Sequence, residues 1–151
     1  MFKIISPVQT VSELNCIKSS NTNIYFIPLS LETLLHCRIN GVHYIDPIKY
    51  LDNSFHEIAL EETEKFTNII PLFSEIVSLQ SEIVAALRSY FHQIIFIECL
   101  LKNILDHEKI HYILVSGWNI NGSLVYSAEN YFTSRIVERF FGSRVKKINS
   151  V

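Results

Sequence analysis

The fold is decided by residues 23–46, which read NIYFIPLSLETLLHCRINGVHYID. The stretch opens with a β-branched and aromatic run, residues 23–27, that is typical of a buried strand. A segment with helical spacing follows over residues 30–40, and residues 42–45 predict a second strand. A strand, a helix and a strand in this order predict a βαβ unit, whose crossover is nearly always right-handed.

The ends of this predicted helix carry the expected signals. Ser30 can act as the N-cap, and Gly41 stands where a helix often ends in a left-handed residue. Pro28 ends the first strand, and Asp46 with Pro47 ends the second. The apolar side of the helix is expected to consist of Leu31, Leu34, Leu35 and either Cys37 or Ile39.

Apolar runs outside this unit predict further strands. Residues 2–6 form a short strand that Pro7 ends, and residues 111–115 form the clearest buried strand of the chain. Residues 124–126 are long enough only for a very short strand. Ser127 can then cap a final helix that Gly142 ends.

The chain closes with a basic tail that contains Arg144, Lys146 and Lys147. Its sign is opposite to that of the glutamate-rich middle of the chain. We expect the tail to be frayed and solvated, and docking on a partner surface is the alternative interpretation.

The middle of the chain is predicted to be helical. Residues 60–70 are acidic on one side, and Pro71 ends this helix or opens the next. Residues 72–106 have apolar residues at helical spacing over a length that is large for one globular helix. A break is therefore expected near residues 79–82.

Residues 83–105 are the most apolar stretch and raise the question of a membrane span. Charged and polar side chains interrupt the stretch, so that no window of the required length is free of charge. We therefore expect a buried helix of a soluble protein and no membrane span. The interrupting residues are Arg88, His92, Gln93, Glu98 and Lys102.

Composition limits the class of protein. The 151 residues are 48% hydrophobic and 19% charged, with a net charge of −2 and a mean hydropathy of +0.22. This length fits a single domain over residues 1–151, and the apolar content excludes disorder. A net charge that is slightly negative rather than basic disfavours nucleic acid as a partner.

Cysteine usage and the start of the chain indicate a compartment. Cys16, Cys37 and Cys99 are widely spaced and include no C-x-x-C pair, which predicts reduced thiols. The first residues lack the apolar run and the cleavage site of a signal peptide. We therefore expect a cytoplasmic protein.

Strands that alternate with helices predict the α/β class. The expected fold is a three-layer, Rossmann-like domain with long helices and a small, mostly parallel sheet of three to five strands. The nearly continuous apolar runs at residues 23–27 and 111–115 support a parallel sheet, because its strands are covered on both faces.

The candidate ligand site is a loop at the end of the strand at residues 111–115. In open parallel sheets, ligands bind beyond the carboxyl ends of the strands. The side chains there are small or amide-bearing with one aromatic ring, which suits hydrogen bonding and stacking on a sugar or a base. The residues of this rim loop are Ser116, Gly117, Trp118, Asn119, Asn121, Gly122 and Ser123.

Two residues of the predicted final helix extend this site. The N–H groups that follow Ser127 can hold an anion, and Glu129 lies in the same first turn. The alternative is an ordinary connecting loop, in which the glycines serve turn geometry and Trp118 packs at the edge of the core.

One sequence motif indicates a metal. His107-Glu108-Lys109-Ile110-His111 matches H-E-x-x-H, in which two histidines on one helix face bind zinc and the glutamate activates water. This match requires a helix, whereas His111 opens a predicted strand. We therefore expect a polar turn and no cofactor, with a zinc hydrolase that uses His107, His111 and Glu108 as the alternative.

Several signatures of other enzymes are absent. The chain contains no G-x-G-x-x-G, no P-loop and no G-x-S-x-G, so it lacks the dinucleotide, P-loop and α/β-hydrolase motifs.

The strand followed by Ser116-Gly117-Trp118-Asn119, and the later segment Ser127-Ala128-Glu129-Asn130-Tyr131-Phe132, resemble the amino-terminal half of bacterial surface-polysaccharide glycosyltransferases of the two-domain GT-B type. The resemblance covers most of the chain and concerns the arrangement of elements. It implies that this half holds the acceptor, whereas a carboxy-terminal half, which is not found here, holds most of the sugar nucleotide.

This resemblance implies a glycosyltransferase-like domain, an acceptor-side or incomplete half, in surface-polysaccharide synthesis. It would bind a sugar nucleotide or an acceptor glycan at the rim loop. The catalytic residue is not identified. Two alternatives stay open: the zinc hydrolase, and a non-catalytic interaction module that docks a partner chain or a second copy.

Overall fold

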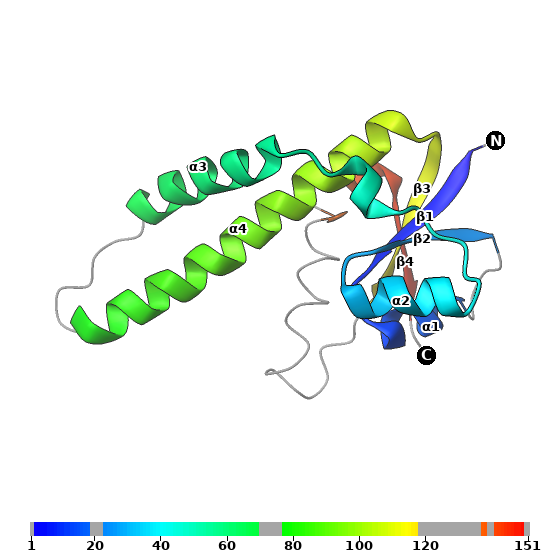
Figure 1. Cartoon of the computed structure of the whole chain (residues 1–151), viewed down its shortest axis with the longest axis horizontal. Coiled ribbons are helices and arrows are strands. Elements are labelled where there is room, and N and C mark those ends of the chain that lie inside the picture. The colour runs from blue at the N-terminus through cyan, green and yellow to red at the C-terminus, as the bar shows by residue number, and fades with distance from the viewer. Residues whose placement is uncertain (1, 19–22, 70–76, 118–136, 139–140, 150–151) are drawn as a thin grey trace. The chain divides into compact units, whose positions relative to one another are not determined.

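The computed structural model describes residues 2–18, 23–69, 77–117, 137–138 and 141–149 (Figure 1). The chain forms two compact units. Residues 1–50 and 103–151 make up the first, which we call the sheet unit, and residues 51–102 make up the second, which we call the helical unit.

The sheet unit contains, within the described residues, four parallel strands in the order β2-β1-β3-β4. They are β1 (Lys3–Val8), β2 (Ile24–Pro28), β3 (Ile110–Gly117) and β4 (Val145–Asn149). Tyr44 adds an isolated parallel bridge to Phe26 of β2. If the bridge at Tyr44 is counted as the third strand along the chain, β3 and β4 become the fourth and fifth. The spatial order is then 3-2-1-4-5, as in a Rossmann fold. The predicted α/β, Rossmann-like class is therefore confirmed.

Two helices connect the first strands of the sheet. α1 (Val11–Lys18) joins β1 to β2, and α2 (Leu31–Ile39) follows β2. Ser30 caps α2 through a hydrogen bond from the Thr33 N–H, and Gly41 lies just beyond the helix with φ of 60°. The predicted boundaries of this helix are thus confirmed. α1 was not predicted.

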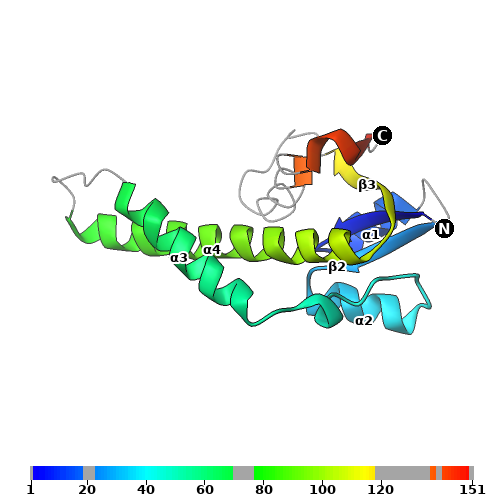
Figure 2. The same ribbon diagram turned by 90° about the horizontal axis from the view of Figure 1, so that it is seen from above.

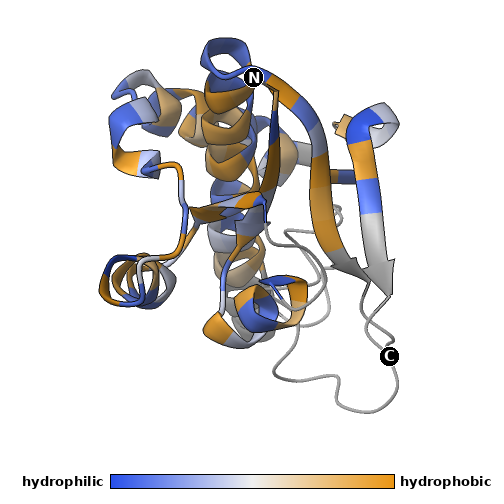
Figure 3. Ribbon diagram, turned by 90° about the vertical axis from the view of Figure 1, so that its right-hand side faces the viewer, coloured by the Kyte–Doolittle hydropathy of each residue, from blue (hydrophilic) through white to orange (hydrophobic). Residues whose placement is uncertain are grey.

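The core of the sheet unit lies between these helices and the strands (Figure 3), and hydrophobic residues line much of β3. It is a cluster of apolar side chains contributed by β1, α1, β2, α2 and β3. Its buried members are Val8, Leu14, Ile17, Ile24, Phe26, Cys37, Val42 and Leu114.

The apolar side predicted for α2 was partly wrong. Leu34 and Cys37 are buried, as expected, but Leu31 and Ile39 are 71% and 80% exposed. The third buried side chain is Thr33, whose hydroxyl donates to the Ser30 carbonyl. The helix therefore buries a narrower stripe than its leucines suggest.

Pro7 does not end β1, contrary to the prediction. The strand continues to Val8, and Pro7 pairs with Ile27 of β2. Proline has no N–H to donate to the ladder on the β3 side. There the carbonyl of Leu114 instead accepts a hydrogen bond from Ser6 Oγ at 2.8 Å.

The ends of the sheet differ from expectation in two further places. Residues 42–45 contribute only the bridge at Tyr44 and not a full strand. The basic tail, expected to be solvated, forms β4, and Lys146 lies opposite Leu114 of β3. The Lys146 Nζ atom stands 4.2 Å from the centre of the Tyr112 ring, so its charge is accommodated on an aromatic face.

The helical unit consists of α3 (Ser54–Ile69) and most of α4 (Val77–His107), which lie side by side in Figures 1 and 2. Stacked rings join them: Phe66 and Phe91 have centroids 4.1 Å apart and nearly parallel planes. Buried Ala59 and Thr63 provide small side chains on α3.

The predicted helix boundaries in this region need correction. α3 begins six residues earlier than expected, at Ser54 rather than residue 60. α4 runs unbroken through residues 79–82, where a break was expected, and ends at His107. At 31 residues it is about 46 Å long.

The expectation that residues 83–105 form a buried helix was also wrong for most of its length. By length and composition, Val84–His107 is the one described helix that could cross a membrane, and 11% of its most apolar window is buried. Leu87 and Tyr90 are 40% and 45% exposed. Burial begins at Leu100, Leu101 and Ile104.

Some predicted elements lie outside the described residues. These are Pro71, the short strand at residues 124–126 and most of the final helix. Of that helix, Val137 is described and fully buried.

A matched pair of substitutions tests the assignment of the core. Ile5 of β1 is fully buried, whereas Ile39 of α2 is 80% exposed. We expect Ile5→Ala to lower the free energy of unfolding by about 3 kcal/mol through lost burial and a cavity. Ile39→Ala should change it by less than about 0.5 kcal/mol. Urea denaturation measures both, and equal effects would contradict the assignment.

Candidate functional site

The carboxyl edge of the sheet is the place where the strand order reverses. From β1 the chain crosses to β2 on one side, whereas β3 pairs with β1 on the other. In doubly wound folds, ligands bind outside the strand ends at this switch point. The loop that leaves β3 here is the predicted rim loop.

The structure describes two of the predicted rim residues. Ser116 and Gly117 form the end of β3 itself, where they pair with Ile148 and Asn149 of β4. The remaining predicted site residues lie outside the described residues: Trp118, Asn119, Asn121, Gly122, Ser123, Ser127 and Glu129.

Polar groups from β1, α1 and α2 converge at the same edge. Ser30 Oγ, at the start of α2, donates to the Gln9 carbonyl at 2.7 Å. The Gln9 N–H donates to Glu13 Oε2 at 3.0 Å, and the Glu13 N–H donates to Thr10 Oγ1 at 3.2 Å. These bonds fix the strand ends relative to one another.

The first turn of α1 is therefore unsuited to a phosphate. In nucleotide-binding Rossmann folds, a glycine-rich turn after the first strand leaves helix N–H groups open to the pyrophosphate. Here the turn is Gln9-Thr10, and the N–H groups of Gln9 and of Glu13 in α1 already donate to side chains. The Glu13 side chain is 3% exposed, so a carboxylate stands where a phosphate would approach.

Sequence reasoning missed this cluster, although a signal was present. Thr10 and Glu13 form the T-x-x-E pattern of a helix start, directly after a strand. Ser30 was predicted to be a helix cap that could also line the rim of the site. Its second role, the bond to Gln9, depends on the pairing of β1 with β2 and has no local signature.

The opposite, amino edge of the sheet holds an ion pair. Lys3 Nζ lies 2.5 Å from Glu108 Oε2, and the Tyr50 hydroxyl donates to Glu108 Oε1 at 2.6 Å. Asn103 Nδ2 donates to the Tyr50 carbonyl at 2.8 Å. Glu108 thus joins the start of β1 to the 3₁₀ turn η1 (Pro47–Tyr50) and to the end of α4.

Both acidic groups of this cluster have shifted pKa values. Hydrogen bonds from Lys3 and then Tyr50 lower the pKa of Glu108, with a further contribution from the Lys3 charge. The hydrogen bond to Glu108, together with burial and the negative charge, raises the pKa of Tyr50 to about 12. Glu108 is therefore held ionised and Tyr50 protonated at neutral pH.

The H-E-x-x-H residues do not share a helix face. α4 ends at His107, whose Nδ1 lies 2.8 Å from the Asn103 carbonyl oxygen. His111 is on β3, where its ring lies 5.1 Å from that of Tyr112. Glu108, the base of the zinc alternative, is held by Lys3 and Tyr50. Within the described ranges, no three metal-ligating side chains come together.

The helical unit contains an open polar hollow of about 270 Å³. Its lining residues are Glu64, Thr67 and Asn68 of α3 and Arg88 of α4. Three of the four are exposed, and the Thr67 hydroxyl is bonded to the Thr63 carbonyl. The hollow thus lacks the buried polar groups that orient a ligand.

Comparison of the chain with protein-family models, with curated proteins and with solved structures found no match.

The ion pair at the amino edge predicts a pH-dependent stability. We expect Glu108→Gln to cost about 1–2 kcal/mol at pH 7, because the Lys3 and Glu108 side chains are 31% and 19% exposed and partly screened. A lowered folded pKa means that the stabilisation is complete above about pH 5 and is lost as the pH falls below about 4.

Urea denaturation at pH values across this range measures the difference in free energy of unfolding between the wild type and Glu108→Gln. This difference should become smaller as the pH falls. The exposed Glu62→Gln is the matched control and should behave as the wild type. A difference that is constant with pH would contradict the role of Glu108.

Metal analysis tests the zinc alternative directly. Because His107 and His111 lie on different elements, we expect the purified chain to hold no stoichiometric zinc. His111→Ala should leave the metal content unchanged. About one zinc per chain that is lost in this variant would establish the H-E-x-x-H site instead.

Proposed function

We propose that the chain is a glycosyltransferase-like domain that binds a neutral glycan, the acceptor, at the carboxyl edge of its sheet. The observation that supports the proposal is that β3, whose last residues Ser116 and Gly117 open the predicted rim loop, ends at the switch point of a Rossmann-like sheet. The role in surface-polysaccharide synthesis comes from the resemblance of arrangement noted above.

The residue types of the rim loop support a glycan. Asn119 and Asn121 carry amides that can donate to and accept from sugar hydroxyls. Trp118 offers an aromatic face on which the apolar side of a pyranose ring can stack. A nucleobase could use the same groups, so the choice between the ligands depends on the neighbouring charges.

The first turn of α1 favours a neutral ligand over a nucleotide. A buried carboxylate, Glu13, lies at the end of β1, and the Gln9 and Glu13 N–H groups are already used. A pyrophosphate at this point would approach the Glu13 carboxylate, with the Gln9 and Glu13 N–H groups already engaged.

Trp118 makes the proposal measurable, because it is the only tryptophan of the chain. We expect neutral oligosaccharides of surface-polysaccharide type to change its fluorescence in a saturable way. A nucleotide diphosphate and its sugar conjugate should produce no such change at the same concentrations. Thermal shift with the same ligands gives an independent measure of binding.

An asparagine pair supplies the variant and its control. Asn119→Ala removes amide hydrogen bonds from the rim loop and should weaken glycan binding by about tenfold. Asn53→Ala, at an exposed position of the helical unit, should leave the affinity unchanged. Binding of the nucleotide sugar alone, or an equal loss in both variants, would overturn the proposal.

A further inference from the structure

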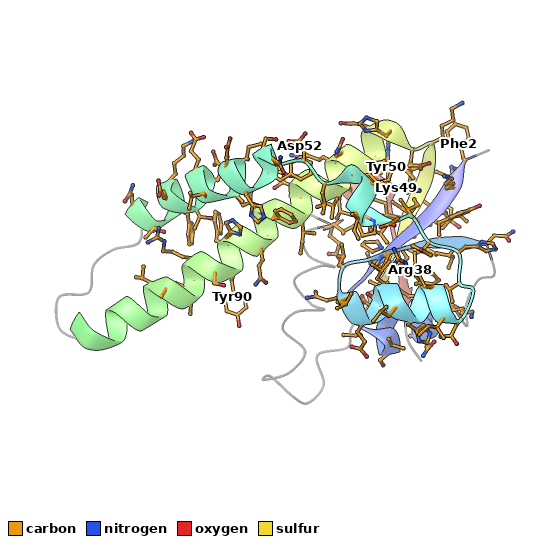
Figure 4. The ribbon with its side chains drawn as sticks, in the orientation of Figure 1. Phe2, Arg38, Lys49, Tyr50, Asp52 and Tyr90 are labelled. Carbon is orange, nitrogen blue, oxygen red and sulfur yellow. The ribbon has the colours of Figure 1, made fainter. Side chains whose placement is uncertain are left out.

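Helix α4 has two apolar faces, of which α3 covers one. The face toward α3 carries Phe91 against Phe66, and Phe96 at 6.2 Å from Phe55 and 4.8 Å from His56. The second face lies nearly opposite on the helix and points away from α3, as Tyr90 shows in Figure 4.

The second face is an apolar stripe with coiled-coil spacing. Leu87, Tyr90, Ile94 and Ile97 follow one another at intervals of three, four and three residues, which are the a and d positions of a heptad. Leu87 and Tyr90 are exposed, and Ile94 and Ile97 are partly exposed. We call these four residues the α4 stripe.

The stripe is a continuation of the buried part of α4. The next positions in the same pattern are Leu101 and Ile104, which are 2% and 0% exposed. The same heptad face is therefore core at the carboxyl end of the helix and surface over its middle. An apolar heptad face of this kind is the seam along which helices pair.

We propose that a second copy of this chain covers the stripe, so that two α4 helices pair about a two-fold axis with α3 on the outside of each. The four helices would then lie side by side in one layer, with the two α4 helices in the middle. This proposal concerns α4 alone and does not depend on the proposed glycan site.

Self-complementarity supports a second copy as the occupant. A two-fold interface brings the same patch together from both chains. The stripe contains no charged residue, so its pairing would not place like charges opposite each other. In an antiparallel pair, Leu87 would meet Ile97 of the partner and Tyr90 would meet Ile94 of the partner. Every layer then joins apolar side chains in either orientation of the helices.

The charges of the helical unit fit this arrangement. The glutamates Glu57, Glu61, Glu62 and Glu64 are on α3, on the far side of α4 from the stripe. They would stay in solvent and away from the axis.

The short stripe predicts a concentration-dependent dimer. Residues 87–97 span about 15 Å, so the contact is smaller than a standard interface. Analytical ultracentrifugation of the full chain over a range of concentrations should show a monomer of 17.5 kDa in equilibrium with a species of twice that mass.

Leu87→Glu places a charge in the stripe and should raise the dimer dissociation constant by at least about tenfold. Ser89→Glu is the matched control, because Ser89 is exposed on α4 but lies outside the stripe. It should dimerise as the wild type does. Circular dichroism confirms that both variants keep their helices.

A wild type that stays monomeric at every concentration would overturn the proposal, as would a dimer that Leu87→Glu leaves intact. A monomer that floats with vesicles of neutral lipid, and loses this property in Leu87→Glu, would assign the stripe to a membrane instead. Glycan binding by a chain that does not dimerise would refute this inference and leave the proposed function standing.

Discussion

The structure of the sheet unit depends on β1, the strand that pairs with neighbours on both sides. Its pairing with β3 joins segments more than a hundred residues apart. The bond from buried Ser6 to the Leu114 carbonyl secures this side of the strand next to Pro7. Because α1 follows β1 directly, the same strand sets the position of Glu13 at the carboxyl edge. The core, the switch point and the candidate site all depend on this central pairing.

The parts of the fold that could be predicted are those with local signals. Ser30 and Gly41 bound α2 through their own chemistry, and the apolar run of β3 marks it without help from other segments. β4 could not be found in this way, because a strand with Lys146 and Lys147 exists only through its backbone pairing with β3. Residues 42–45 are the reverse case, because their sequence is typical of a strand but they contribute only the isolated bridge at Tyr44.

The candidate site likewise has one part with a local sequence signal and one part that depends on strand pairing. Its place after β3 is a prediction from a general property of parallel sheets, and most residues of the rim loop lie outside the described part of the chain. The carboxylate of Glu13 and the bonds of Gln9 and Ser30 at the same edge are products of strand pairing. The H-E-x-x-H match shows that a sequence pattern alone can suggest a metal site where the glutamate has another role. Glu108 is engaged by Lys3 and Tyr50, which are 105 and 58 residues away in sequence, and no local rule predicts such partners.

The crossover between Tyr44 and β3 separates the two proposed functions along the chain. In a Rossmann fold a single helix usually makes this connection, whereas here the helical unit is inserted into it. α4 returns to the sheet at the amino end of β3, where the Glu108 cluster anchors it, and the rim loop leaves from the other end. Eight residues of β3, about 26 Å, separate these two points. The proposed stripe of α4 and the proposed glycan site therefore belong to different segments of the chain, one in the insertion that precedes β3 and the other after β3.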